Sequence, residues 1–174
     1  MKRLLIVVDM QNDFIDGSLG TGEAKEIVPN VIRKIKAYKE QGDDVVFTMD
    51  THFEDYLETL EGKNLPVVHC VKGTKGWELQ EEIGSFSGER FEKVTFGCLK
   101  CADFAAGQGY DAVELVGLCT DICVISNALL VKAAMPYTPI SVDASCCAGV
   151  TPESHRNALK AMKMCQIQVI QAAD

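Results

Sequence analysis

The chain has 174 residues, of which 47% are hydrophobic and 24% are charged, and its formal net charge is −8 at pH 7. These values are typical of one soluble globular domain over 1–174, and the negative charge argues against nucleic acid or an anionic membrane as the main partner. Hydrophobic runs fall short of the roughly 20 residues of a membrane span, and the run after Arg3 is too short for a signal peptide, so we expect a cytoplasmic protein.

Short apolar runs alternate with segments of helical periodicity along the chain. In order, they predict a strand over 4–8, a helix over 26–41, a strand over 44–49, a long loop over 53–76 with a short strand near 67–68, a helix over 77–83, a strand over 91–96 and a helix over 99–108. The pattern continues with a strand over 112–116, a helix over 122–134, a strand over 138–142, a helix from Thr151, its expected N-cap, and Pro152 to about 164, and a strand over 166–170.

This alternation predicts an α/β fold with three layers, in which a mostly parallel, six-stranded, Rossmann-like sheet carries helices on both faces. Ligands of such sheets bind at the carboxyl ends of the strands. Three strand ends carry reactive side chains, namely Asp9, the pair Asp50 and His52, and Cys123, and Lys93 lies on a short strand of its own. We expect the sheet to bring these residues to one edge.

Cys123 lies just after the strand over 112–116 and in the first turn of the next predicted helix. Unpaired backbone N–H groups and the positive end of the helix dipole favour a thiolate there. An α/β enzyme would place a nucleophile at such a position. The alternative is that Cys123 is a small buried apolar residue, as free cysteines usually are.

A cysteine nucleophile needs a base to take its proton and a positive charge to hold the thiolate. Asp9 could be the base and Lys93 the cation, because Lys93 has apolar neighbours and a buried ammonium needs a carboxylate partner. The alternatives are that Asp9 is an N-cap or a structural ion-pair partner and that Lys93 is a solvated surface charge.

Asp50, His52 and the later His69 are typical of a metal site, since carboxylate and imidazole groups suit zinc, iron or manganese. Glu61, or in second place Glu58, could complete the ligand set. The alternative is that both histidines are hydrogen-bonded structural residues.

The eight cysteines are expected to be reduced thiols, because the chain is long enough to bury a core without disulfides. Cys98 and Cys101 form a lone CxxC, which does not match zinc-ribbon spacing and leaves a redox pair as the alternative. We expect the adjacent Cys146 and Cys147 to be packing residues.

Five segments, in this order and spacing, together resemble the isochorismatase-like cysteine hydrolases and, within them, the nicotinamidases. They are Leu-Leu-Ile-Val-Val-Asp-Met-Gln-Asn-Asp-Phe from Leu4, Asp50-Thr-His52, Pro-Val-Val-His-Cys-Val-Lys-Gly-Thr-Lys-Gly from Pro66, Lys93, and Gly-Leu-Cys-Thr-Asp-Ile-Cys-Val from Gly117. The resemblance extends over nearly the whole chain.

The resemblance implies a catalytic triad in which Asp9 is the base, Lys93 stabilises the thiolate and the transition state, and Cys123 is the nucleophile. It also implies a cis peptide bond at Leu118–Cys119, which would turn the Cys119 N–H toward the Cys123 N–H to form an oxyanion hole.

For the substrate, the resemblance implies contacts from Phe14 and Leu118. It further implies a divalent metal, zinc in the first place and iron or manganese otherwise, that binds the pyridine nitrogen of the substrate. Its ligands would be Asp50, His52, Glu61 and His69.

The chain departs from the family pattern at two points. The further histidine that many nicotinamidases carry after the Asp-x-His pair is missing here, and some relatives use a glutamate, which would be Glu61 or else Glu58. Pro66 replaces a bulky aromatic residue three positions before the last metal histidine, so the substrate pocket should differ.

The resemblance therefore predicts hydrolysis of nicotinamide to nicotinate and ammonia through a thioester, a step of NAD salvage. The alternatives are the same triad acting on another small amide, such as an N-carbamoyl compound or a ureide, and a non-catalytic, redox-responsive thiol protein. The expected partners are a small-molecule amide and further copies of the chain in a homo-oligomer.

Overall fold

The computed structural model describes residues 1–170 and contains one six-stranded sheet in the order β3-β2-β1-β4-β5-β6. Every neighbouring pair of strands is parallel, which confirms the predicted α/β class and makes the sheet fully parallel. The strands are β1 (Arg3–Val8), β2 (Asp44–Asp50), β3 (Arg90–Lys93), β4 (Ala112–Leu118), β5 (Ile140–Ala148) and β6 (Gln168–Ile170).

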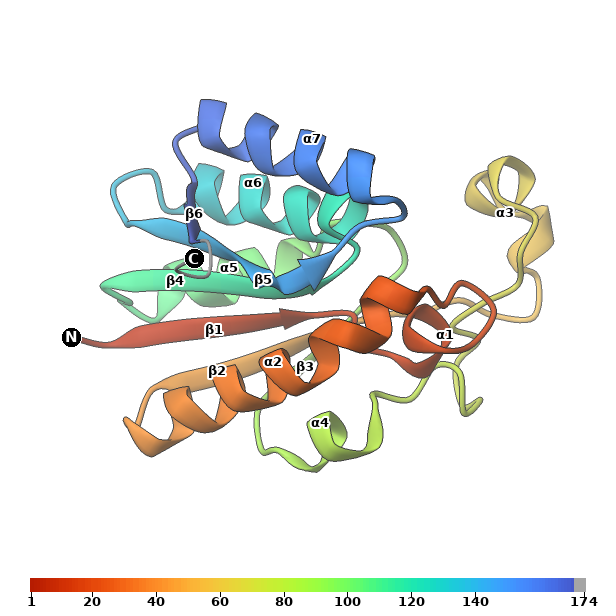
Figure 1. Ribbon diagram of the computed structural model, residues 1–174, viewed down its shortest axis with the longest axis horizontal. Helices are drawn as coiled ribbons and strands as arrows, with labels where there is room; N and C mark the ends of the chain where they lie inside the picture. The colour runs from red at the N-terminus through yellow and green to blue at the C-terminus, as the bar shows by residue number, and fades with distance from the viewer. Residues whose placement is uncertain (171–174) are drawn as a thin grey trace.

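Helices cover both faces of the sheet (Figure 1). One face carries α1 (Asn12–Ile15), α2 (Gly22–Glu40) and α4 (Glu81–Ser85), and the other carries α5 (Leu99–Gly107), α6 (Ile125–Ala134) and α7 (Pro152–Met164). The 3₁₀ turn η1 (Tyr56–Glu58) and helix α3 (Leu60–Asn64) form a flap that projects beyond the sheet (Figure 1). Within residues 1–170, no helix combines the length and apolar character needed to span a bilayer.

The apolar run of β1 is unbroken because this strand is buried on both sides. Leu4, Ile6 and Val8 pack under α5, α6 and α7, whereas Leu5 and Val7 pack under α2. All five side chains are fully buried. A strand that contributes to two cores cannot show the apolar–polar alternation of a half-exposed strand.

The position of β1 also locates the site. The chain builds β1, β2 and β3 outward in one direction and then returns to place β4 on the other side of β1. Ligands of open α/β sheets bind outside the carboxyl ends of the strands at this reversal. Asp9, Asp50, Lys93 and Cys123 all lie at or just after the ends of these four strands.

Four predicted elements differ in the structure, and the first is the strand predicted over 91–96, which spans Arg90–Lys93 instead. Residues 67–68 form no strand, and only an isolated bridge joins His52 to Val71 nearby. The helix predicted over 77–83 begins at Glu81, because Leu79 instead pairs with Gln11 in an isolated bridge. These loop segments take their shape from contacts with distant residues, which local periodicity does not record.

The segment around the predicted nucleophile also differs from the expected helix. A single π-helical turn, η2 (Thr120–Val124), comes before α6, so the regular helix begins after Cys123 rather than before it. The predicted start of α7 is confirmed, since the Thr151 side chain accepts the Ser154 N–H and Pro152 is the first helical residue.

Candidate active site

Asp9, Lys93 and Cys123 converge at the carboxyl edge of the sheet. Lys93 Nζ lies 2.7 Å from Asp9 Oδ2 and 3.5 Å from Cys123 Sγ. None of the three residues is more than 5% exposed. The structure therefore brings together three ionisable groups that are separated by up to about two thirds of the chain, and it shields them from water.

Residues of β1, β2 and β4 position Asp9. Its backbone has a left-handed φ of 46°, and its Oδ1 accepts a 2.6 Å hydrogen bond from Thr48 Oγ1. A Cβ at Gly117 would lie only 2.1 Å from the Val8 carbonyl oxygen. Glycine at 117 therefore allows β4 to approach β1 closely just before the loop that leads to Cys123.

Asn127 holds Cys123 against the loop that follows Lys93. Its side-chain amide donates to the carbonyl oxygens of Cys123 at 2.8 Å and Phe96 at 3.1 Å, and its Oδ1 accepts the Cys98 N–H at 2.9 Å. Asn127 is 2% exposed. This buried amide satisfies three backbone groups and fixes the distance between the nucleophile candidate and the β3–α5 loop.

Burial is the main influence on the protonation of the triad. It raises the pKa of the Cys123 thiol well above its usual value, the Asp9 carboxylate adds to this, and Lys93 opposes it. Burial therefore opposes the thiolate that the position at the helix start was predicted to favour. Burial also raises the pKa of Asp9, against the opposing effect of Lys93, which suits a group that accepts a proton.

Lys93 keeps its charge although it is buried. Burial alone would lower the pKa of its ammonium, but the carboxylates of Asp9 and Asp50 oppose this effect and the pKa is raised. Lys93 Nζ also donates to the Thr95 carbonyl oxygen at 3.0 Å and to Asp50 Oδ1 at 3.3 Å.

Asp50, His52, Glu61 and His69 form a second cluster beside the triad. One ligand atom from each residue lies within 4.8 Å of all the others. Asp50 Oδ2 is 3.0 Å from His52 Nε2 and 3.4 Å from His69 Nε2. Glu61 Oε1 lies 3.6 Å from His52 Nε2. Two carboxylates and two imidazoles suit zinc, iron or manganese, so the donor set fits a divalent metal.

The structure separates the two glutamates that the sequence left as alternatives. Glu61 in α3 reaches the cluster, whereas Glu58 in η1 is exposed and does not belong to it. Thr59 lies between them and caps α3 by accepting the Gly62 N–H at 3.0 Å. This cap starts a new helix between the two glutamates, so only the second one faces the histidines.

His69 is held in an orientation that suits a metal ligand. Its Nδ1 lies 2.7 Å from the Val67 carbonyl oxygen, which directs Nε2 toward Asp50 and Glu61. The rings of Phe14 and Tyr56 pack edge-on against the His69 imidazole, with centroids 5.5 Å and 5.0 Å away.

Asp50 joins the two clusters. Its Oδ1 faces Lys93 and its Oδ2 faces both histidines. Burial alone would raise the pKa of this carboxyl, but hydrogen bonds from His52 and His69 and the charge of Lys93 hold it well below its usual value. Asp50 is therefore an anion shared between the triad and the candidate metal ligands.

Gln11 is a further residue of the site, and no pattern in the sequence pointed to its role. Its Nε2 donates to the carbonyl oxygens of Asp50 and Trp77, both at 2.8 Å, and its Oε1 accepts the Asp50 N–H at 2.8 Å. Gln11 is fully buried. Its place two residues after Asp9 was the only available signal, because its partners are backbone groups distant in sequence.

A cavity of about 290 Å³ lies between the two clusters. Cys123, Asp50, His69 and Glu61 are on its walls, and most of the remaining lining is apolar: Phe14, Leu19, Ala24, Leu65, Phe96, Leu118, Ile122 and Val150. The structure thus places both predicted substrate contacts, Phe14 and Leu118, on the cavity. The peptide bond between Leu118 and Cys119 is cis, as the resemblance implied.

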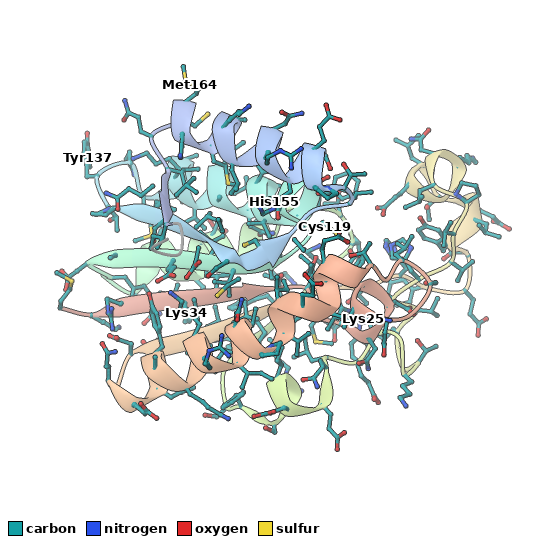
Figure 2. The ribbon with its side chains drawn as sticks, in the orientation of Figure 1. Lys25, Lys34, Cys119, Tyr137, His155 and Met164 are labelled. Carbon is teal, nitrogen blue, oxygen red and sulfur yellow. The ribbon has the colours of Figure 1, made fainter. Side chains whose placement is uncertain are left out.

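The third histidine supports the loop beside this cavity. His155, in the first turns of α7, pairs with Thr120 Oγ1 at 2.7 Å, and Asp121 accepts the Val150 N–H at 3.1 Å. Figure 2 shows His155 near Cys119 at the edge of the sheet where β4 and β5 end. These contacts tie the Cys119–Asp121 loop to the start of α7.

Comparison with known proteins places the chain in a family. A family model described as the isochorismatase domain matches residues 3–174. The nicotinamidase/pyrazinamidase of Mycobacterium tuberculosis is 29% identical over 191 aligned residues, which cover 97% of this chain and 98% of the relative.

Solved structures agree in fold over nearly the full length. The pyrazinamidase of Pyrococcus horikoshii in complex with zinc superposes with a TM-score of 0.83 at 30% identity, covering 98% of this chain and 99% of that one. The N-carbamoylsarcosine amidase of Thermoplasma acidophilum superposes with a TM-score of 0.79 at 27% identity, covering 100% and 98%. Since the family model matches almost the entire sequence, this chain belongs to the isochorismatase family.

Proposed function

We propose that this protein is a cysteine-dependent amidohydrolase that converts nicotinamide to nicotinate and ammonia. The observation that carries the proposal is the position of Lys93 Nζ, 2.7 Å from Asp9 and 3.5 Å from Cys123, where Cys123 lines the same cavity as Asp50 and His69. The similarity to a nicotinamidase/pyrazinamidase over the whole chain supports the choice of substrate.

In the proposed reaction, Asp9 takes the proton of the Cys123 thiol as the sulfur attacks the carboxamide carbon. Lys93 stabilises the negative charge that develops on the sulfur and on the carbonyl oxygen. The backbone N–H groups of Cys119 and Cys123 hold the oxyanion, and a donor of this kind contributes about 10²–10³ in rate.

The C–N bond then breaks, and Asp9 gives its proton to the departing ammonia. A thioester remains between Cys123 and the acyl group. Asp9 next takes a proton from a water molecule, whose oxygen attacks the thioester carbon. The C–S bond breaks, Asp9 passes this proton to the sulfur, and the product leaves as nicotinic acid, which ionises to nicotinate in water.

Asp50, His52, Glu61 and His69 would hold a divalent metal, and zinc in the Pyrococcus horikoshii relative supports that choice. When bound, the metal supplies a Lewis acid that accepts the pyridine nitrogen. Phe14 and Leu118 would confine the flat ring so that the carboxamide faces Cys123.

The alternative substrates, N-carbamoyl compounds, are supported by the similarity to an N-carbamoylsarcosine amidase. A carbamoyl amino acid carries a carboxylate, which a binding site usually pairs with arginine or lysine. Among the described residues that line the cavity there is neither, and two of the lining residues are acidic. The lining therefore favours an uncharged aromatic amide.

The test is ammonia release from nicotinamide by the purified, zinc-loaded protein. The Cys123→Ala variant should lose at least about 10³-fold in kcat, because it lacks the sulfur that lies 3.5 Å from Lys93 Nζ. Cys165→Ala is the matched control, since Cys165 is exposed at the end of α7 and should leave the rate unchanged. Substantial turnover by a folded Cys123→Ala protein would rule the mechanism out.

Iodoacetamide labelling of the wild-type protein tests the non-catalytic thiol alternative. If Cys123 is the nucleophile and Asp9 takes its proton, Cys123 should react with iodoacetamide faster than the buried Cys98 and Cys101. We expect this although burial favours the thiol form of Cys123. Slow labelling of Cys123, together with no ammonia release, would favour the thiol protein.

A further inference from the structure

A second hollow lies directly beside the substrate cavity. Its volume is about 590 Å³, twice that of the inner cavity. The two share four lining residues, which are Glu61, Leu65, Phe96 and Ile122. These side chains therefore form the wall between the inner cavity and the outer hollow.

The wall is made of side chains from separate segments. Leu65 comes from the end of the η1–α3 flap, which projects from the body of the protein (Figure 1), and Phe96 comes from the loop after β3. They are 38% and 43% exposed, and as apolar groups they have no hydrogen bonds to break. Joining the two spaces would need a rotamer change at one or both of them, at a cost that a bound ligand can offset.

The outer hollow is lined mainly by exposed apolar side chains. Leu60, Val94 and Phe53 are 79%, 68% and 53% exposed and lie on it together. An apolar group of this extent beside a reaction site marks a surface that binds something. Its charged lining residues are Asp55 and Glu61, and within the described lining there is no lysine or arginine.

We propose that the outer hollow is a second subsite, which accepts an uncharged apolar substituent on the ring that carries the amide. The preferred substrate class is then a heteroaromatic carboxamide larger than nicotinamide, with a fused ring or an alkyl or aryl group extending past Leu65 and Phe96. The inference rests on the proposed function, which places the amide beside Cys123. The wall shared by the two spaces then gives the direction in which a substituent extends.

Charge decides which substituents fit. A carboxylate in the outer hollow would face Asp55, and the described lining has no lysine or arginine to pair with it. A fused benzene ring instead buries four added carbons, which is enough for about a tenfold or greater gain in affinity.

Binding to the zinc-loaded Cys123→Ala protein tests the subsite without turnover. By calorimetry, quinoline-3-carboxamide should bind at least about tenfold tighter than nicotinamide. A pyridine-3-carboxamide with an added ring carboxylate should bind more weakly than nicotinamide. Equal or weaker binding of the quinoline amide would overturn the proposal, as would tighter binding of the anionic compound.

A pair of flap variants locates the effect. Leu60→Asp places a charge in the outer hollow and should remove most of the quinoline preference, measured as the ratio of the two dissociation constants. Leu57→Asp is the control, because Leu57 is 51% exposed on the same flap but lines neither space. A ratio that changes equally in both variants, or in neither, would contradict the proposed subsite.

Ammonia release by the wild-type protein separates the two proposals. If nicotinamide is hydrolysed but quinoline-3-carboxamide binds no better, the subsite alone fails. If the quinoline amide binds tightly while neither amide is hydrolysed, the proposed activity fails and the subsite stands.

Discussion

At the scale of single residues, the site depends on buried polar groups whose partners all come from other segments. Gln11 joins the end of β1 to the end of β2 and to Trp77 by three hydrogen bonds of 2.8 Å. Because it holds both backbone groups of Asp50, it determines where that carboxylate stands between Lys93 and the histidines. We therefore assign Gln11 a positioning role.

Gln11→Glu tests this role with almost no change of shape. The change replaces the Nε2 donor by an oxygen that faces two carbonyl oxygens, so the protein should lose about 1–3 kcal/mol of unfolding free energy at neutral pH. The zinc affinity should fall by about 10–100-fold, as it does when a partner that orients a ligand is lost. Urea unfolding and chelator competition measure the two effects, and Gln108→Glu, at an exposed helix end, should change neither.

The pH dependence of the same variant gives a further check. Burial raises the folded-state pKa of the introduced carboxyl above its unfolded value, so the folded state favours the protonated form, which regains one donor. The stability deficit should thus be smallest at low pH and grow as the pH rises toward that raised pKa. A deficit that shrinks between pH 5 and pH 8 would contradict the assigned hydrogen bonds.

At the scale of elements, the predictions succeeded where local pattern decides structure and failed where distant contacts do. The runs in β1 and β2 are strands because both faces are buried, and the Thr151–Pro152 start of α7 is a local signal. The segment around His69 carries no such signal. Its turn is set by Asp13, which accepts the Cys70 N–H at 2.8 Å from 57 residues away.

The contact between η2 and α7 is another link that spacing could not reveal, and it can be tested. Thr120→Val keeps the shape but removes the hydroxyl that pairs with His155 at 2.7 Å. Because Cys119 precedes Thr120 and its N–H is a proposed oxyanion donor, kcat should fall several-fold while KM changes little.

Unfolding of Thr120→Val should show a loss of about 1 kcal/mol for one buried hydrogen bond. Thr138→Val, in the loop before β5 and remote from the cavity, is the matched control and should leave kcat unchanged. A Thr120→Val enzyme with altered KM and normal kcat would place the contact in substrate binding rather than in oxyanion support.

At the scale of the whole molecule, the sheet explains why the meeting of the strand-end residues could be predicted from sequence and the pocket could not. Asp9, Asp50 and Cys123 follow apolar runs, and the topology of parallel strands requires such residues to meet at the reversal beside β1. The outer hollow depends instead on where the flap of η1 and α3 lies, and this flap has no periodic pattern.

The position of the flap also affects the metal site, because Glu61 is the one candidate ligand among the four that lies on the flap. If Glu61 is a ligand, zinc at about 100 times its dissociation constant should stabilise the wild-type protein by about 2.7 kcal/mol. Glu61→Gln weakens the site, so the same zinc concentration should add much less to its free energy of unfolding. Glu58→Gln is the matched control on the same flap, since Glu58 is exposed and lies outside the cluster. Thermal unfolding with zinc and with chelator measures the stabilisation by zinc in each variant. If the two variants respond to zinc alike, the fourth ligand is not Glu61, and the histidines with Asp50 would bind the metal without help from the flap.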